Sequence, residues 1–227
     1  IGMFAGMSWA SSVEYYRVIN ETVQQRMGGS NSARIAMFSV NFAEIYGMRD
    51  KGGWEAVAEE IIRVVRGLER SGADFFILTA NTLHIVAERV ETSVSIPLLH
   101  IADATAGAIK AAGLKKVGLL GTKYTMLEDF YRVRLKERHG IDVVIPGEAD
   151  VKRVDSIIFD ELVMDNFLDE SRRATLDVIE GLVSEGAEGI VLGCTELPLL
   201  VKPEEITVPS FDTLTLHAVA AADMSLE

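Results

Sequence analysis

The sequence is poor in thiols, in long apolar runs and in positive charge. Cys194 is its only cysteine, which excludes a disulfide within the chain and a metal site built from several cysteines. No apolar run reaches the ~18 residues of a membrane span. The N-terminus also lacks the basic segment that would indicate a signal peptide. The 22 Lys and Arg residues are outnumbered by 34 Asp and Glu, and the net charge of -12 argues against a nucleic-acid partner. We therefore expect a soluble, cytoplasmic protein without a membrane segment.

The composition and the apolar pattern predict an α/β fold. Hydrophobic residues make up 48% and charged residues 25% of the chain, a globular balance. The length allows one broad domain or two lobes of about 110 residues each. Short, continuous apolar runs are typical of parallel sheets covered on both faces, and amphipathic stretches between them predict helices. We expect strands at 33–40, 74–79, 96–101, 116–121, 141–145 and 188–193.

Three stretches carry signals for helices. A capping box at 11–14 and a stop at Gly28 bound the first, a stop near Gly72 ends the second, and a third is expected over 125–138. Apolar residues at helical spacing should form the buried faces. They are Val13, Tyr16, Ile19, Val23 and Met27 in the first helix, and Val57, Ile61, Val64 and Leu68 in the second.

The chain also repeats itself. Residues 71–82 (SGADFFILTANT) align without a gap with residues 185–196 (EGAEGIVLGCTE), at an offset of 114. Ile1-Gly2 matches Val117-Gly118, and Ile96-Pro97 matches Val208-Pro209, at offsets of 116 and 112. The repeat predicts two similar α/β lobes, which we place at 1–97 with 208–227 and at 98–207. Chance likeness between βα units is the alternative.

The repeat sets two polar turns in equivalent places. Thr79-Ala80-Asn81-Thr82 and Gly193-Cys194-Thr195-Glu196 each follow a predicted strand, where open α/β sheets bind ligands. If the lobes face each other, Ala80 and Cys194 meet one ligand in one cleft. A helix beginning after Cys194 should lower the pKa of its thiol, and the thiolate could then accept a proton or act as a nucleophile. The alternative is a buried, inert cysteine.

These turns resemble a known family. Gly193-Cys194-Thr195-Glu196, Asn81-Thr82-x-His84 and Gly6-Met7-Ser8 are similar to motifs of the aspartate/glutamate racemase superfamily, and the resemblance covers essentially the whole chain. Further segments resemble its broad-specificity amino-acid racemases, namely 6–9 (GMSW), 39–42 (SVNF), 100–105 (HIADAT), 121–126 (GTKYTM) and 211–213 (FDT). The resemblance implies two pseudo-symmetric α/β lobes with parallel sheets, an active site in the cleft between them and a homodimer. It also implies inversion of an amino-acid α-carbon by two cysteines, without pyridoxal phosphate or a metal.

The resemblance assigns roles to individual residues. Cys194 is the second catalytic cysteine, and Ala80 stands where the first is expected. Thr82 and Thr195, with helix N-termini behind them, would help to stabilise the carbanion-like charge that forms next to the substrate carboxylate, and Asn81 would hold the ammonium or the carboxylate. Thr122 and Thr125 either line the cleft or cap the helix that follows. The substrate-binding residues expected are Met7, Ser8, Arg49, Asn81, Thr82, Thr122, Thr125, Thr195 and Glu196.

Ala80 leaves three readings open, because alanine has no proton to give. Cys194 could work with another donor, namely Thr79, Thr82, His84 or a water molecule. The chain could be an inactive variant, engineered or natural, that only binds amino acids. It could also perform one-sided chemistry, as in the superfamily's arylmalonate decarboxylases, which keep a single cysteine. His84 could alternatively orient the turn, while His100 and His217 are expected to be structural.

Substrate choice is expected to be broad or neutral. Aspartate-selective relatives carry a Lys in the segment that corresponds to 161–165, and this chain has no Lys or Arg there. Arg49 could supply one positive charge if the 42–50 loop folds over the cleft, or it could be an ordinary surface residue. Homoserine, aspartate and glutamate are the substrates to examine, with the acidic ones expected to be weaker.

Overall fold

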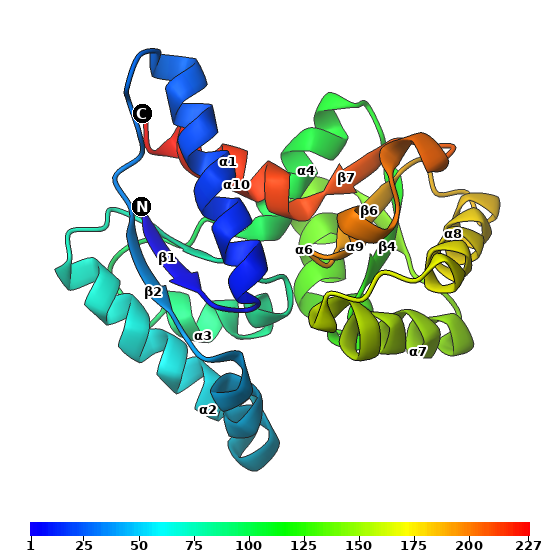
Figure 1. Cartoon of the computed structure of the whole chain (residues 1–227), viewed down its shortest axis with the longest axis horizontal. Helices are drawn as coiled ribbons and strands as arrows, with labels where there is room; N and C mark the ends of the chain where they lie inside the picture. Colours follow the sequence, from blue (N-terminus) through cyan, green and yellow to red (C-terminus); the bar gives the residue numbers. More distant parts are fainter. The chain divides into compact units, whose positions relative to one another are not determined.

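The computed structural model describes all 227 residues, which form two compact units (Figure 1). Ile1–Ile101 and His217–Glu227 make the first unit, and Ala102–Leu216 make the second. Each unit has its own parallel sheet and its own apolar core. None of the helices has the length and the apolar character that a membrane crossing requires.

The first unit is built on a three-stranded parallel sheet in the order β2-β1-β3. The strands are β1 (Gly2–Ala5), β2 (Ala36–Ser39) and β3 (Phe76–Leu78). Gly2 of the central strand lies opposite Ala36 on one side and Phe76 on the other. Its helices are α1 (Trp9–Met27), α2 (Phe42–Arg70), the 3-10 helix η1 (Thr82–Val86) and α3 (Ala87–Glu91), together with the end of α10 (Thr213–Met224).

The second unit has a four-stranded parallel sheet in the order β5-β4-β6-β7. Its strands are β4 (Lys116–Gly121), β5 (Asp142–Val144), β6 (Ile190–Gly193) and β7 (Ser210–Asp212). The longer helices are α4 (Ile101–Ala111), α6 (Asp129–His139), α7 (Glu148–Ser156) and α8 (Asp169–Ser184). The short ones are α5 (Lys123–Leu127), η2 (Ile157–Glu161), η3 (Leu162–Met164), α9 (Leu197–Leu200) and η4 (Pro203–Glu205).

The sequence repeat has a counterpart in the hydrogen bonds of the two sheets. The Gly2 N–H donates to the Phe75 carbonyl at 2.8 Å, and at the repeat-related positions the Gly118 N–H donates to the Gly189 carbonyl at 2.8 Å. Pro97 and Pro209 correspond in the same way, because their carbonyls accept from the first residues of β3 and β6 at 3.0 and 2.9 Å. The first strand of each unit is also flanked by the second and third. The repeat therefore reflects shared strand pairing rather than a chance likeness of βα units.

The expected boundary between the lobes is wrong at its second crossing. We placed 208–227 in the first lobe, but β7 pairs with β6 in the second unit, with Ser210 opposite Ile190. The chain returns to the first unit only at His217. At the first crossing, residues 98–101 remain with the first unit, where Leu98 forms a single bridge to Phe76. The expected strand at 96–101 does not extend further, since Pro97 has no N–H and Ile101 already begins α4.

Helix α1 presents a different face to the core than its periodicity predicts. Ser8, not Ser11, is the N-cap, and its hydroxyl accepts from the Ser11 N–H. Val13 and Tyr16 are 59% and 50% exposed. The buried residues are Ser11, Ser12, Tyr15, Val18, Ile19, Thr22 and Val23. Apolar side chains occur on both faces of this helix, so spacing alone did not identify the buried one.

The other expected helices need smaller corrections. The stripe of α2 is buried as predicted, but this helix already begins at Phe42, and its backbone breaks at Gly53, where φ is +66°. Residues 42–50 are therefore helical and not a loop. The helix expected over 125–138 is interrupted at Glu128, which has an extended backbone and separates α5 from α6.

Candidate active site

The turn after β6 brings a carboxylate to the only thiol. Cys194 follows the last residue of β6 and is 8% exposed. Its Sγ–H donates to Oε2 of Glu196 at 3.2 Å, and the Thr195 hydroxyl donates to the same oxygen at 2.6 Å. The expected roles of Thr195 and Glu196 were substrate contacts. The geometry joins both side chains to the sulfur through one carboxylate oxygen, and their contact with a substrate stays a prediction.

The electrostatics at Cys194 reverse one sequence prediction. Burial raises the pKa of the Cys194 thiol well above its usual range, and the negative Glu196 carboxylate raises it further. The backbone N–H groups of Glu196 and Leu197 act in the opposite direction but do not outweigh these two effects. The expected lowering of the pKa is therefore wrong, since α9 spans only four residues and contributes little helix dipole. The resting group is a protonated thiol, hydrogen-bonded to the Glu196 carboxylate.

Two glycines allow the neighbouring turn to approach Cys194. Gly121 and Gly193 lie opposite each other at the ends of β4 and β6. A Cβ on Gly121 would lie 2.8 Å from the Gly193 carbonyl oxygen, and one on Gly193 would lie 2.8 Å from the Leu120 carbonyl oxygen. Both contacts are too short for a side chain. The close backbone packing therefore sets the turn at residues 122–125 beside the Cys194 turn.

Thr122 and Thr125 occupy that neighbouring turn. Thr122 is the N-cap of α5, because its hydroxyl accepts from the Thr125 N–H at 3.3 Å. The two hydroxyl oxygens lie 3.3 Å apart, and both side chains are buried. The capping alternative is thus confirmed for Thr122, and a substrate contact stays a prediction for both threonines.

In the first unit the expected residues gather at the carboxyl ends of β1 and β3. The Gly6-Met7-Ser8 turn follows β1, and the turn at residues 79–82 follows β3, its neighbour in the sheet. Ser12 ties the first turn together, since its hydroxyl donates to the Ser8 carbonyl at 2.7 Å and accepts from the Gly6 N–H at 2.8 Å. Only glycine fits at position 6, where φ is +101° and a Cβ would collide with the Val40 carbonyl oxygen.

The turn at residue 80 is held by its neighbours. Thr79 is fully buried, and its hydroxyl donates to the Phe4 carbonyl at 3.0 Å. Asn81 is 3% exposed, whereas Ala80 and Thr82 are partly buried. His84 is buried with Nδ1 at 3.1 Å from the Ala80 carbonyl oxygen, as expected for a residue that orients this turn. Thr79 and His84 are therefore engaged with the backbone rather than poised as second proton donors.

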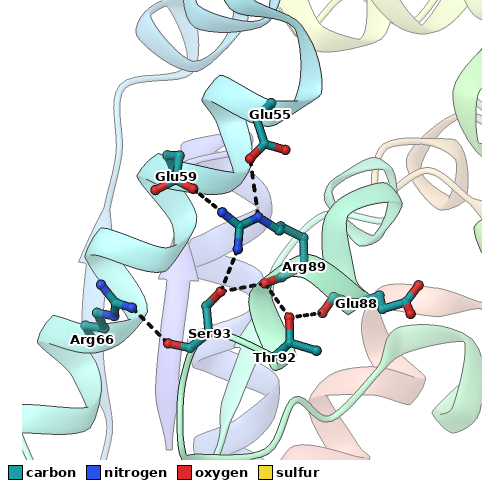
Figure 2. A network of polar contacts seen from close by, with 7 residues as sticks. All are labelled: Glu55, Glu59, Arg66, Glu88, Arg89, Thr92 and Ser93. Carbon is teal, nitrogen blue, oxygen red and sulfur yellow. Dashed lines mark hydrogen bonds and ion pairs between the residues drawn. The ribbon is translucent and has the colours of Figure 1, made fainter.

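Helix α3, which continues the chain after this turn, is fastened to α2 by the network in Figure 2. The Arg89 guanidinium donates to Glu59 at 2.7 Å and to Glu55 at 3.3 Å. Arg66 donates to the Ser93 carbonyl at 3.2 Å. The network links α2 to α3 through side chains that are largely exposed.

Arg49 lies in the first segment of α2. Its guanidinium donates to Asp50 at 2.8 Å and lies 4.3 Å from the centre of the Tyr46 ring, which stacks on Phe42. Its positive charge is thus shared with a carboxylate. The segment 161–165, where selective relatives carry a Lys, forms the end of η2, η3 and Asp165, with Met164 73% exposed. No three His, Cys, Asp or Glu side chains are grouped as metal ligands would be.

Sequence reasoning did not anticipate that Glu196 acts on the sulfur. The spacing Cys-x-Glu after a strand was the available signal, because residues two apart in a tight turn can bring their side chains together. The close approach of Gly121 and Gly193 was also missed. Both lie at strand ends whose pairing was not known from the sequence.

A family model described as Asp/Glu/Hydantoin racemase matches residues 5–221. The chain belongs to this family. The broad specificity amino-acid racemase RacX of Bacillus subtilis (strain 168) is 25% identical over 214 residues, which are 94% of this chain and 92% of RacX. Family membership supports an amino-acid racemase activity in general.

Two crystal structures of racemase relatives are similar over the full length. A protein from Yersinia pestis, assigned as an Asp/Glu racemase, is 45% identical with a TM-score of 0.94, covering 100% of this chain and 98% of that one. An aspartate racemase homologue from Pyrococcus horikoshii OT3 is 33% identical with a TM-score of 0.85 and the same coverage. These racemase structures confirm the expected α/β fold with parallel sheets.

Proposed function

We propose that this chain is a cofactor-independent amino-acid racemase in which Cys194 is the acid/base group at the α-carbon and Glu196 is its proton partner. The observation that carries the proposal is the 3.2 Å hydrogen bond from the thiol to the carboxylate, at the carboxyl end of a parallel strand. The family supplies the reaction class. The geometry places a carboxylate oxygen within hydrogen-bond distance of the thiol, where it can accept the thiol proton.

The proposed reaction begins at the dyad. The Sγ–H proton moves to Oε2 of Glu196, and the thiolate then removes the α-proton of the substrate, leaving a carbanion stabilised by nearby N–H and hydroxyl donors. Return of the α-proton by Cys194 to the same face restores the original enantiomer. Delivery of a proton to the opposite face inverts it. The side chain of Ala80 carries no proton donor, so inversion should be slower than return of the proton to the original face.

Inversion needs a second proton donor, on the face of the substrate opposite Cys194. Thr79 and His84 contact backbone carbonyl oxygens, and we propose the Thr82 hydroxyl or a water molecule as the donor. We propose that Asn81, Thr82, Thr195, Met7, Ser8, Thr122 and Thr125 contact the substrate. Because the charge of Arg49 is shared with Asp50, we expect neutral amino acids such as homoserine to be better substrates than aspartate or glutamate.

The decisive experiment follows both outcomes in deuterium oxide. Each enantiomer of homoserine, aspartate and glutamate is incubated with the protein, with proton NMR measuring α-deuterium and chiral chromatography measuring inversion. We expect deuterium uptake to exceed net inversion for one enantiomer, and Cys194→Ser to abolish both. Ala80→Cys should raise inversion by about 10²–10⁴-fold, the usual contribution of a positioned acid. Absence of α-deuterium in every amino acid, in both the unmodified chain and Ala80→Cys, would refute the proposal.

One observation favours a second candidate function. A decarboxylation that forms a carbanion needs a proton donor on one face only, and Cys194 is a single, protonated thiol. A one-cysteine decarboxylase would release CO2 from a substituted malonate, which a coupled assay detects. Calorimetric binding of an amino acid without exchange or CO2 release would instead indicate a binding protein.

We also propose that the chain forms a homodimer. Trp9, Val13 and Tyr16 lie on one face of α1 at helical spacing and are 74%, 59% and 50% exposed. An apolar stripe of this kind is suited to an isologous contact, in which the same surface of two identical chains meets.

A further inference from the structure

Three buried imidazoles pack together in the first unit. His84, His100 and His217 are 1%, 2% and 0% exposed. The ring centres of His84 and His100 lie 4.4 Å apart, and those of His84 and His217 lie 6.0 Å apart. Three positive charges at these separations, out of contact with water, would repel one another strongly. The three rings therefore cannot all be charged, and a neutral ring in the cluster must carry its one proton on a particular nitrogen.

The partners of His84 specify which nitrogen is protonated. The Ile101 N–H, which can only donate, points at Nε2 from 3.3 Å. Nδ1 faces the carbonyl oxygens of Ala80 and Asn81 at 3.1 and 3.2 Å, and these can only accept. Both ends of the ring therefore require the same form, with the proton on Nδ1 and a lone pair on Nε2. The ring joins the carbonyls of the residue-80 turn to the first residue of α4.

His217 has the opposite tautomer for the same kind of reason. Its Nε2 lies 2.8 Å from the Leu99 carbonyl oxygen, which accepts, so Nε2 carries the proton. Its Nδ1 then accepts from the Tyr15 hydroxyl of α1 at 2.9 Å. Two histidines thus form hydrogen bonds with the segment 99–101, His217 with the Leu99 carbonyl and His84 with the Ile101 N–H.

We infer that His84 is a positioning residue for the candidate active site: its neutral imidazole, fixed with the proton on Nδ1, holds the carbonyls of Ala80 and Asn81 and so sets the direction of the turn. The inference rests on the proposed function, in which this turn meets the substrate. His84 itself does not touch the substrate. Its effect is transmitted through the backbone to the side chains of residues 80–82, where a displacement of about 1 Å is costly to catalysis.

Two substitutions separate the two ends of the ring. The side-chain amide of Asn reaches about as far as Nδ1, so His84→Asn retains a donor for the Ala80 carbonyl and loses the acceptor for Ile101. The amide of Gln reaches about as far as Nε2, so His84→Gln retains an acceptor for Ile101 and loses the donor to the turn. Both variants leave a gap in the same buried cluster, so they serve as matched controls for lost packing.

The first measurement does not depend on activity. Nitrogen-15 NMR of histidine-labelled protein distinguishes protonated from unprotonated ring nitrogens, and the His84 signals are assigned by their loss in His84→Asn. We expect the proton on Nδ1 of His84 and on Nε2 of His217. A His84 signal with the proton on Nε2, or with both nitrogens protonated at neutral pH, would overturn the inference.

The second measurement reports on the turn itself. Ala80→Cys places a thiol in the turn, and its rate of alkylation is followed by peptide mass spectrometry, separately from that of Cys194. We expect this rate to change by at least about tenfold when His84→Gln is added and by less than about threefold with His84→Asn, with α-proton exchange following the same order. Equal effects of the two variants on the alkylation rate would show a merely structural role and overturn the inference. If no exchange occurs at all, the proposed function fails, and the NMR and alkylation results still decide the role of His84.

Discussion

At the Cys194 sulfur, burial and a carboxylate act together against ionisation, while two backbone N–H groups act for it. A thiol in this balance is poorly reactive toward alkylating reagents at neutral pH, because only the thiolate is a good nucleophile. It remains a competent proton donor. The residue therefore suits proton transfer better than covalent catalysis, and in the proposed reaction Glu196 takes its proton.

Replacing Glu196 should make Cys194 easier to alkylate and should slow the exchange of the substrate α-proton. In Glu196→Gln the negative charge is gone, so the pKa of Cys194 should fall relative to the natural chain, and alkylation by iodoacetamide should begin at lower pH. The α-proton exchange should slow by about 10²-fold or more, since an amide cannot take the thiol proton. Mass spectrometry across pH and exchange by NMR measure the two effects. Glu204→Gln, at an exposed position of η4, is the control, and an unchanged alkylation profile in Glu196→Gln would contradict the assignment.

His217 should make the fold sensitive to acid. Burial lowers its pKa from the usual 6.5 to about 4, so between these values the unfolded chain binds a proton that the folded chain does not. The free energy of unfolding should therefore fall as the pH drops from about 6.5 to 4, by roughly 3 kcal/mol from this group alone. Urea titrations at pH 7 and pH 4.5 measure the loss. His217→Gln should be less stable at pH 7 but lose less on acidification, and an equal loss in both proteins would argue against this origin.

At the scale of elements, the ion pairs between α2 and α3 should contribute little to stability. Arg89, Glu55 and Glu59 all have side chains about half exposed or more, where water and salt screen the charges. We expect Arg89→Met to lower the free energy of unfolding by less than about 1 kcal/mol, and the difference to shrink in 1 M salt. Arg63→Met is the matched control, because the ion-pair partner of Arg63 is Glu60 of α2 itself. If Arg89→Met lowered the free energy of unfolding well beyond the control, the contacts drawn in Figure 2 would be more stabilising than the exposure of their side chains suggests.

The ends of β4 and β6 pack too closely for a methyl group to be added at Gly121 without a shift of the backbone. In Gly121→Ala the new Cβ would meet the Gly193 carbonyl oxygen and Thr125, so the Cys194 turn must shift. We expect a loss of about 1–3 kcal/mol in stability together with loss of exchange activity. Gly181→Ala on the exposed face of α8, where nothing lies near the new Cβ, should instead stabilise by about 1 kcal/mol. Similar melting temperatures for both variants would show that the strand ends can separate without cost.

The elements with strong local signals were predictable from the sequence, and those that depend on pairing were not. The run at 116–121 gave β4 with its correct ends, and the stripe of α2 gave its buried face. The three residues of β7 lack an apolar run, so only their pairing with β6 defines them as a strand. For the site, the repeat located both turns, but the contact between Cys194 and Glu196 depends on side-chain directions that spacing does not contain.

At the scale of the whole molecule, the exposed stripe on α1 makes the proposed homodimer testable. Val13→Glu places a charge in the centre of the stripe, and its copy in the partner would add repulsion. We expect sedimentation velocity to show a dimer for the natural chain and a monomer for this variant. Val133→Glu, at a 37% exposed apolar position of α6, should remain dimeric. A dimer that survives Val13→Glu would place the contact on another surface.

The order of the two units along the chain has a consequence for biosynthesis. The second unit is one uninterrupted stretch, whereas the first is completed only by residues 217–227, which include the histidine that grips Leu99. During translation, the middle of the polypeptide can fold as soon as it leaves the ribosome, while the amino-terminal portion must wait for the last segment to emerge. The first unit therefore begins earlier in the chain than the second and is completed after it.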